Sequence, residues 1–528
     1  MLDLIIKNAN VYDGSGSPAQ KMDVCVQNGK IVSVGKTNGG RAVTEIDASG
    51  LTLTPGFIDV HAHSELQLLA DPSRWCKLKQ GVTTEIGGQC GWSLAPFPET
   101  APKEWIDYIN KNAQPFLNTY AEAVSLLNTL KFGANQACFI GHLYLRGAVA
   151  GLEDRPVSAK ELETMCAMME EGMQSGAFGL SSGLVYAPGI YSSEHELTEI
   201  AKVVGRYGGR YTTHIRNEGD NLIEAVQEAL RIGEAAGVPV NISHLKALFP
   251  ENYGKIDTVL EMIDKANTHG ANVTFDVYPY TACSATITST LPPSYMSHGR
   301  AWLMEHLEGK ENIEALRKAI YEPTETWENP VGKVGIQCQL IASAPKTPEA
   351  VGLRLSEYAK LRGVDDITAY ADLIRLNEAR VTDIRFLMSE ENVEKLYSHP
   401  VCMVGSDGLY RGDRSIQHVR AFATFIRYLS HYIRDRHVLS MEEGIHRLTG
   451  MPADLYGLEG KGHIAVGCDA DFVLLDLDKL AEKATYANPF IPNEGIHMVF
   501  VNGRAAVVDN ELTGVMDGKV ILRKQARP

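Results

Sequence analysis

Short apolar runs separated by turn residues occupy both ends of the chain. Near the start, residues 2–6, 23–26 and 31–34 are rich in β-branched side chains, and Gly, Asn and Ser stand between them. Residues 471–475 and 498–501 repeat this form near the end. Runs of this length bounded by turn residues are typical of β-strands. We therefore expect all-β structure at both ends, assembled into one small domain.

The middle of the chain alternates between helical and extended patterns. Residues 158–176 carry apolar side chains at helical spacing behind a capping box of Ser158 and Glu161. Extended runs at 210–215 and 238–244 each follow a helical stretch. Strands and helices that alternate through short links favour a parallel sheet. Over so long a region, a closed (β/α)8 barrel is the favoured form.

Residues 285–350 interrupt this alternation. They contain Pro292-Pro293, an acidic helix-like stretch and an extended patch at 334–341. We interpret them as an insertion near the mouth of the barrel, where they would shape a substrate pocket.

Composition and charge narrow the class of protein. Hydrophobic residues make up 44% and charged residues 22% of the 528 positions, which excludes a disordered or collagen-like chain. The net charge of −15 argues against a nucleic-acid or membrane partner, since both need basic patches. The start of the chain has the pattern of a strand and not of a signal peptide. Nine scattered cysteines fit no disulfide framework, so we expect a cytoplasmic protein.

The strongest local signal for chemistry is a pair of histidines at the end of an apolar strand. His61 and His63 follow the run Pro-Gly-Phe-Ile-Asp-Val. Alternate side chains of a strand point to one face, so the two imidazoles would project together and could share one metal ion. The alternative to a metal site is that the two histidines are unrelated and partly buried. The preceding motif makes that interpretation weaker than the metal site.

Four further residues stand at the carboxyl ends of later predicted strands: Cys90, His214, His244 and Asp407. Taken singly, each has a purely structural interpretation, because a lone cysteine is usually a small buried apolar residue and a lone aspartate often caps a helix or a turn. Together with the histidine pair, they supply nitrogen, sulfur and oxygen donors at the mouth of the barrel. Such a donor set suits zinc.

At this point the sequence resembles the amidohydrolase superfamily, and within it the N-acyl-D-amino-acid deacylase (D-aminoacylase) group. The resemblance covers nearly the whole chain and rests on the motifs PGFIDVHAHSE, GVTTEIGGQCGWSLAP, GLSSGLVYAPG, THIRNEG, SHLKA, DVYPYTA, GSDG and GCDADFVLLD. It implies an α/β fold, a TIM-like (β/α)8 barrel that carries a small β-sandwich built from both termini. The expected domains are residues 1–56 plus 460–528 for the sandwich and 57–459 for the barrel.

The resemblance also implies the activity and the roles of the candidate residues. One or two Zn²⁺ ions would activate a water molecule that cleaves the amide bond of an N-acyl-D-amino acid. His61, His63 and Asp407 would form one metal site, and Cys90, His214 and His244 the tighter one, with Cys90 able to bridge. Asp407 would accept the proton of the water and pass it to the leaving amine. The expected partner is this small substrate, and both a monomer and a homo-oligomer stay open.

A deacylase for acyl amino acids must also bind a free carboxylate, which requires a positive side chain at the mouth. If the predicted strand continues, Lys246 would point to the same side as His244, two residues earlier. The resemblance makes Lys246 and Tyr278 the first candidates for this role. Secondary candidates are Tyr186, Arg380, Arg385 and Arg216, for which solvated or packing roles are the alternative.

Other functions are compatible with parts of the sequence. Cyclic-amide hydrolases of the superfamily often bridge two metals with a carboxylated lysine after the fourth strand, and no lysine occurs from residue 161 to 201. Residues 179–183 match the Gly-x-Ser-x-Gly motif of serine hydrolases, but a helix precedes them and Pro188-Gly189 prevents a helix directly after. A non-catalytic relative would be expected to lose ligands, and none of the six is missing.

The sequence departs from the deacylase pattern at two places. Gln89 stands where the family usually has Asn, and His418-Val419-Arg420 replaces His-Pro-Arg. These changes leave the candidate ligands intact and bear on the shape of the substrate pocket.

Overall fold

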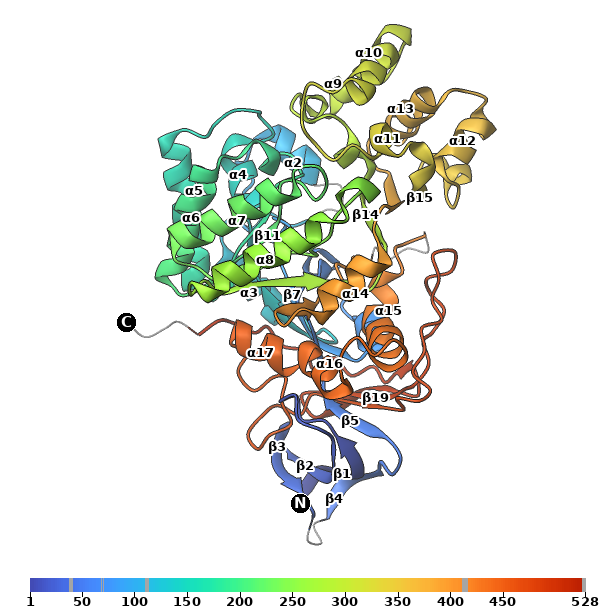
Figure 1. Ribbon diagram of the computed structural model, residues 1–528. Coiled ribbons are helices and arrows are strands. Elements are labelled where there is room, and N and C mark those ends of the chain that lie inside the picture. Colours follow the sequence, from blue (N-terminus) through green and yellow to red (C-terminus); the bar gives the residue numbers. More distant parts are fainter. Residues whose placement is uncertain (38–40, 68, 70, 110–113, 411–415, 525–528) are drawn as a thin grey trace.

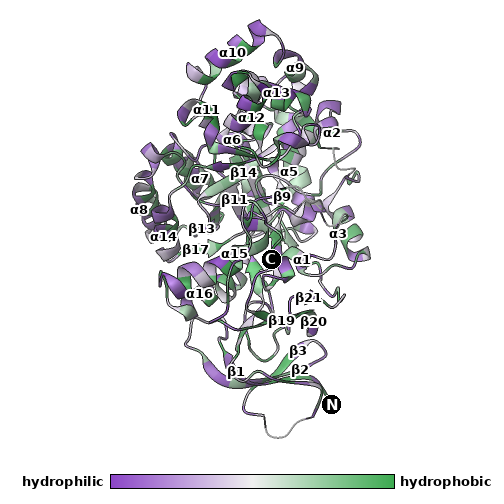
Figure 2. Cartoon of the chain, turned by 90° about the vertical axis from the view of Figure 1, so that its right-hand side faces the viewer, coloured by the Kyte–Doolittle hydropathy of each residue, from purple (hydrophilic) through white to green (hydrophobic). Residues whose placement is uncertain are grey.

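The computed structural model describes residues 1–37, 41–67, 69, 71–109, 114–410 and 416–524 of the chain (Figure 1). A parallel barrel occupies the centre. A β-sheet domain lies at one end and a mostly helical insertion at the other, an arrangement that both views show (Figures 1 and 2). The predicted fold class is confirmed.

The sheet at the lower end of Figure 1 draws its strands from both ends of the chain. It runs in the order β21-β20-β19-β18-β5-β1-β2-β3, and β4 pairs with β1. The antiparallel pair β5–β18, with Phe472 opposite Pro55, joins the two halves. Its strands are β1 (Leu2–Val11), β2 (Gln20–Gln27), β3 (Lys30–Gly35), β4 (Ala42–Asp47), β5 (Thr52–Pro55), β18 (Phe472–Leu475), β19 (Ile496–Val501), β20 (Arg504–Val508) and β21 (Glu511–Leu512).

One hydrophobic cluster explains why the two ends meet. Leu4, Ile6 and Leu53 from the start of the chain pack with Phe472 and Phe500 from its end, and all five are buried. Neither end has enough apolar surface to form a core alone, so the terminal strands complete each other.

In the described part of the chain, the barrel wall consists of eight parallel positions, called staves here, each formed by one strand or by two consecutive short strands. Three form one arc in the order β6-β7-β8, and the other arc runs β17-β13-β12-β11-β10-β9. Strands β8 and β9 are one stave interrupted at Phe139, and a bridge between Ala62 and Gly408 closes the ring. The strands are β6 (Phe57–Asp59), β7 (Val82–Gly87), β8 (Asn135–Cys138), β9 (Ile140–Gly141), β10 (Gly179–Gly183), β11 (Arg210–His214), β12 (Val240–Ile242), β13 (Val273–Val277) and β17 (Cys402–Val404).

Helices cover the outside of the barrel, and α5, α6, α7 and α8 follow one another around it (Figure 1). Helix α5 begins with the predicted capping box, in which Ser158 and Glu161 bind each other's backbone N–H groups. Gly237 ends α7 in the left-handed conformation that glycine adopts without strain. The covering helices are α1 (Trp75–Leu78), α2 (Lys103–Ile109), α3 (Tyr120–Thr129), α4 (His142–Ala150), α5 (Ala159–Gln174), α6 (Glu194–Arg206), α7 (Leu222–Ala236), α8 (Lys255–Thr268), α14 (Glu390–Ser398), α15 (Arg420–Arg427), α16 (Met441–Leu448) and α17 (Gly450–Tyr456).

The insertion has a sheet and a core of its own. An antiparallel sheet, β14-β16-β15, supports helices α9 to α13. A separate buried cluster runs from Ile287 to Val381, so the insertion extends past the expected limit at residue 350. Its elements are β14 (Ala282–Thr286), α9 (Gly299–His306), α10 (Lys310–Tyr321), α11 (Pro330–Lys333), β15 (Gln339–Ser343), α12 (Leu355–Arg362), α13 (Asp366–Leu376) and β16 (Thr382–Phe386).

Among the described residues, no helix is both long and apolar enough to cross a membrane.

Candidate metal centre

Six predicted ligands come together at the carboxyl ends of the staves, where barrel enzymes place their active sites. All six are buried: His61, His63, Cys90, His214, His244 and Asp407. They reach this place from five different strands, because every stave ends at the same face of the barrel.

The Cys90 thiol lies at the middle of the group. Its Sγ is 3.2 Å from Nε2 of His61 and 3.3 Å from Nε2 of His244. Burial opposes ionisation of the thiol, but His61 and His244 outweigh this effect and hold the pKa of Cys90 well below its ordinary value. A thiolate is the form of cysteine that binds metals.

His214 completes the side of the centre formed by β11 and β12. Its ring centroid is 4.3 Å from that of His244. Neither ring nitrogen of His214 has a hydrogen-bond partner within the described structure, although both are buried. A buried, unpartnered imidazole is costly unless a ligand satisfies it.

Asp407 occupies the opposite side of the centre. Its Oδ1 lies 3.1 Å from Nε2 of His63 and 3.7 Å from Nε2 of His61. Its Oδ2 lies 2.9 Å from a guanidinium nitrogen of Arg420. Burial raises the pKa of Asp407, but Arg420, His244 and His63 outweigh that effect and hold it well below the usual range.

Three residues of the centre have a left-handed backbone. The φ angles are +52° for Cys90, +37° for His244 and +47° for Asp407. Residues other than glycine rarely adopt this conformation, which costs about 1–3 kcal/mol at each position and is concentrated at functional sites. Each of the three stands two or three residues after the end of its strand.

Asp276 fixes the orientation of the first histidine, a role that the sequence analysis missed. It stands in β13, and its Oδ1 lies 3.2 Å from Nδ1 of His61. It also accepts hydrogen bonds from the His244 backbone N–H at 2.9 Å and from Asn241 at 2.7 Å. A carboxylate that binds one ring nitrogen leaves the other free for a metal. The available signal was its place near the carboxyl end of an apolar strand, the same place that His214 takes in β11.

The close approach of Asp276 and His61 depends on a glycine. A Cβ atom at Gly405 would stand 2.5 Å from Cβ of His61 and 2.8 Å from Oδ1 of Asp276. A larger residue would therefore push these two side chains apart.

Glu218 is the second residue that the sequence analysis missed. It accepts hydrogen bonds from Nδ1 of His244 at 3.0 Å and from Nζ of Lys246 at 2.5 Å. Burial opposes its charge, but Lys246 and the two nearby histidines outweigh this effect and lower the pKa of Glu218 to about 2. Its spacing of four residues from His214, in THIRNEG, was the available signal.

The structure places Lys246, Tyr278 and Tyr186 beside the centre. The ammonium group of Lys246 lies 5.6 Å from the ring centroid of Tyr278, and the guanidinium of Arg420 lies 4.8 Å from the same centroid. The ring of Tyr186 is 5.2 Å from that of His214. Arg420 was noted in the sequence only as part of an altered motif, and its place in the group appears only in three dimensions.

The other three arginines are engaged elsewhere. Arg380 lies on the surface of the insertion and pairs with Glu378. Arg385 forms a buried pair with Asp383 at 2.8 Å. Arg216 binds Glu228 and the carbonyl oxygens of Ile190 and Ser192. No contact in the described structure joins Arg380 to the centre, and the carboxylates that pair with Arg385 and Arg216 are those of Asp383 and Glu228.

The motif in residues 179–183 is not a nucleophile elbow. These residues form the barrel strand β10, with helix α5 before them. Ser181 is buried in the strand and accepts a hydrogen bond from the backbone N–H of Gly91 at 3.1 Å. The serine-hydrolase alternative is therefore excluded at this site.

The residues present fit a metal ion. Donor atoms of His61, Cys90, His244 and Asp407 lie within 4.8 Å of one another, as do those of His214, Glu218 and His244. A thiolate, neutral imidazoles and a carboxylate in one buried place are the ligands that zinc prefers. The unpartnered nitrogens of His214 point to the same conclusion.

A parallel barrel with buried nitrogen, sulfur and oxygen donors at its mouth defines the chain as one of the metal-binding barrel enzymes. Comparison with known proteins identifies the family, because residues 44–507 match the amidohydrolase family. The chain belongs to the amidohydrolase family.

Three relatives are similar over almost the whole chain. The chain is 32% identical to D-aminoacylase of Alcaligenes xylosoxydans xylosoxydans, over 99% of its own length and 98% of the relative's. It is 34% identical to N-acyl-D-aspartate deacylase of the same organism, over 100% and 96%. The crystal structure of N-acyl-D-glutamate deacylase from Bordetella bronchiseptica, complexed with zinc and a phosphonate mimic of the tetrahedral intermediate, matches with a TM-score of 0.84 and 30% identity, covering 99% and 100%.

Proposed function

We propose that this chain is a zinc-dependent N-acyl-D-amino-acid deacylase, which hydrolyses the amide bond to a carboxylate and a free D-amino acid. The observation that carries the proposal is the thiol of Cys90 between His61 and His244, on a chain similar throughout its length to three deacylases of this kind. The fourth stave, β10, ends at Gly183 and no lysine follows before residue 202, so a bridging carboxylated lysine has no source there. The thiolate of Cys90 would take that place.

The ligand assignment follows from which donors lie together. Cys90, His214 and His244 would hold one zinc ion, and His61, His63 and Asp407 the second position, with Cys90 reaching both. When bound, zinc lowers the pKa of water toward 7 and polarises the carbonyl oxygen of the substrate. Asp276 and Glu218 keep the Nε2 atoms of His61 and His244 directed toward the centre, because each carboxylate holds the opposite ring nitrogen.

Asp407 would be the general base and acid. Its pKa is held well below the usual range, so the side chain is a carboxylate at neutral pH. Oδ1 faces the donors of the centre and would take the proton of the attacking water, then deliver it to the leaving amine. Arg420 holds Oδ2 at 2.9 Å, which leaves Oδ1 as the oxygen that exchanges protons.

Two cations beside the centre would bind the free carboxylate of the substrate. Lys246 and Arg420 both lie over the ring of Tyr278. Each is buried and partly neutralised, Lys246 by Glu218 and Arg420 by Asp407. The guanidinium nitrogen of Arg420 that pairs with Asp407 makes no hydrogen bond of ordinary geometry, and a second one donates to the carbonyl oxygen of Ser284 at 3.1 Å. A carboxylate placed between these cations would form charge-assisted hydrogen bonds, which anchor the amino-acid half of the substrate.

The remaining expectations belong to the same proposal. The partner is the small N-acyl amino acid and neither nucleic acid nor a membrane surface. The scattered cysteines, all free in the described structure, support a cytoplasmic location. Both a monomer and a homo-oligomer agree with the features of this chain.

The proposal is tested by metal analysis combined with a hydrolysis screen. The purified protein is assayed with N-acetyl and N-formyl derivatives of D- and L-amino acids, with hydantoin and with dihydroorotate. We expect one or two zinc ions per chain and turnover of N-acyl-D-amino acids. Turnover of cyclic amides alone would move the chain to another branch of the family, and absence of both metal and turnover would refute the proposal.

A further inference from the structure

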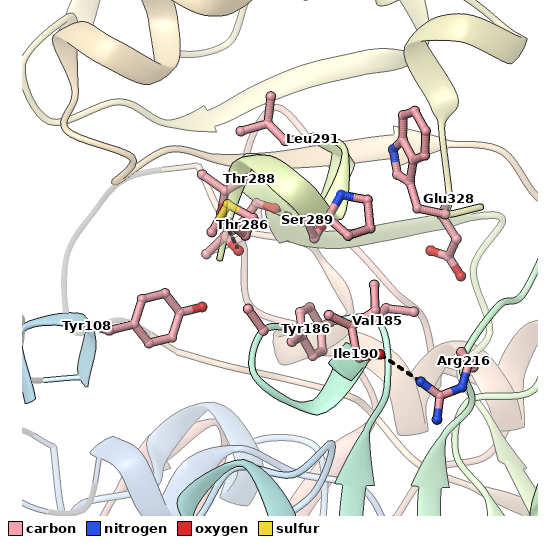
Figure 3. A pocket seen from close by; sticks show the side chains of 14 residues that line it. Tyr108, Val185, Tyr186, Ile190, Arg216, Thr286, Thr288, Ser289, Leu291 and Glu328 are labelled. Carbon is pink, nitrogen blue, oxygen red and sulfur yellow. Dashed lines mark hydrogen bonds between the residues drawn. The ribbon is translucent and has the colours of Figure 1, made fainter. Parts of the chain in front are cut away.

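A hollow lies between the barrel and the insertion (Figure 3). The loop after β10 supplies Val185, Tyr186 and Ile190 from the barrel side. Thr286, Ser289, Leu291 and Glu328 come from the insertion, and Figure 3 shows the two groups facing each other. The remaining lining residues are Tyr108, Ala187, Arg216, Thr288, Pro293, Met296 and Trp327.

Two contacts connect this hollow with the metal centre. Tyr186 lines the hollow and also packs 5.2 Å from His214, measured between ring centroids. Glu328 accepts a hydrogen bond at 2.8 Å from the backbone N–H of Glu218, whose side chain binds His244 and Lys246. The hollow therefore adjoins the side of the centre where Lys246 would hold the substrate carboxylate. The Cα atom that carries this carboxylate also carries the amino-acid side chain, so the side chain would enter the hollow.

The hollow is lined by one positive and one negative side chain, and among the described residues only the positive one has a charged partner. The guanidinium of Arg216 is a lining group, but Glu228 at 2.9 Å and two backbone carbonyl oxygens engage it. Glu328 is the carboxylate of the lining, and no described cation forms an ion pair with it. Burial and the nearby Glu218 raise its pKa, because both penalise the negative charge. The hydroxyl groups of Thr286, Thr288 and Ser289 add further hydrogen-bonding groups.

We propose that Glu328 makes this hollow a pocket for amino-acid side chains that donate hydrogen bonds, neutral or cationic, and that it rejects acidic side chains. The inference rests on the proposed deacylase function and names its substrate class. A donor such as an amide or an ammonium group relieves the half-buried charge of Glu328, whereas a second carboxylate adds to it. Sequence similarity does not indicate which side chains the enzyme accepts. Relatives named for acidic D-amino acids and a relative named for D-amino acids in general match the chain almost equally.

The test compares substrates of nearly equal size. We would measure kcat/KM of the zinc-loaded enzyme for the N-acetyl derivatives of D-glutamate, D-glutamine, D-lysine and D-methionine. Like charges juxtaposed at a binding interface cost several kcal/mol, so kcat/KM for D-glutamine should exceed that for D-glutamate by about a hundredfold. The variant Glu328→Gln should reduce that ratio by about tenfold or more and leave D-methionine within about threefold of the parent.

The matched control is Glu325→Gln, three residues away. It removes the same charge from an exposed carboxylate that binds Ser294, so its substrate preference should equal that of the parent. Preference of the parent for D-glutamate, or an unchanged ratio in Glu328→Gln with zinc content and circular dichroism preserved, would overturn the inference. Absence of turnover with every N-acyl-D-amino acid would instead refute the proposed function itself.

Discussion

The two oxygens of Asp407 face opposite ways, and Arg420 holds one of them. Oδ2 lies 2.9 Å from the guanidinium of Arg420, and Oδ1 lies 3.1 Å from His63. The ion pair keeps the carboxylate charged and fixes its rotation, so one oxygen is committed to the charge partner and the other to the centre. This division supports different roles for the two oxygens and makes the first prediction specific.

Replacing Asp407 by Asn removes the proton acceptor and preserves the shape of the side chain. We expect kcat to fall by about 10²–10⁴, the usual contribution of a general acid–base group. Zinc bound by Cys90, His214 and His244 should stay. The measurement is kcat together with zinc content. Asp471→Asn is the control, since it breaks a buried pair with Lys461 far from the centre and should cost stability without this loss of kcat. Unfolding of Asp407→Asn with full activity of its folded fraction would assign Asp407 a structural role.

Replacing Cys90 by Ala removes the only thiol at the centre of the described ligand group. Both proposed zinc positions use this thiolate, so we expect zinc content to drop and turnover to be abolished. Cys76→Ala is the matched control: it removes another buried thiol, whose pKa burial raises to about 12, and should keep zinc and activity. Full zinc content and activity in Cys90→Ala would contradict the ligand assignment.

Removal of the metal should be reversible. Dialysis against a chelator at neutral pH should abolish turnover, and one or two equivalents of zinc per chain should restore it. Because a ligand that binds only the folded state stabilises it, the melting temperature of the metal-free protein should be lower and should rise with added zinc. Activity that persists with no detectable metal would contradict a metal-dependent reaction.

Lys246→Met tests the carboxylate site. A hydrogen bond to a charged group contributes about 1.5–3 kcal/mol, so KM for an N-acyl-D-amino acid should rise by about tenfold to a hundredfold. An N-acylamine without the carboxylate should be hydrolysed equally slowly by parent and variant. Lys395→Met is the control, because that lysine pairs with Asp257 on the exterior. Equal losses for substrates with and without the carboxylate would mean that Lys246 only supports Glu218.

The capping box of helix α5 gives a dependence on pH. Hydrogen bonds from Arg155 and from the backbone of Ser158 lower the pKa of Glu161 from 4.5 to about 2. A carboxylate with a lowered folded-state pKa stabilises the fold above its unfolded pKa, and this contribution is lost as the pH falls from about 4.5 to about 2. In Glu161→Gln, amide exchange in the first turn of α5 should be about fivefold faster at pH 6, the usual effect of a lost cap, and nearly equal to the parent near pH 2. Glu163→Gln on the exposed face should match the parent at every pH. A pH-independent difference would contradict the role of the carboxylate charge.

Periodicity and motifs in the sequence determined the fold class and the six candidate ligands. The capping box before α5, the strand that ends at His214 and the glycine that ends α7 are local features, and local hydrogen bonding and alternation are enough to specify them. The ligands were recognisable because each follows an apolar strand, and parallel staves must end at one face of a barrel.

Only the tertiary structure decided which other residues join them. Asp276 and Glu218 reach the histidines across different staves, and Arg420, the first residue of α15, meets Asp407 from outside the barrel strands. Arg380 had an equally suitable side chain, yet the segment between α13 and β16 carries it to the surface of the insertion. The type of a residue determines which groups its side chain can bind. Long-range packing determines which of those groups lies close enough to be bound. For that reason the donors were readable in the sequence, whereas their orientation and the positions of Arg420 and Glu328 beside them were not.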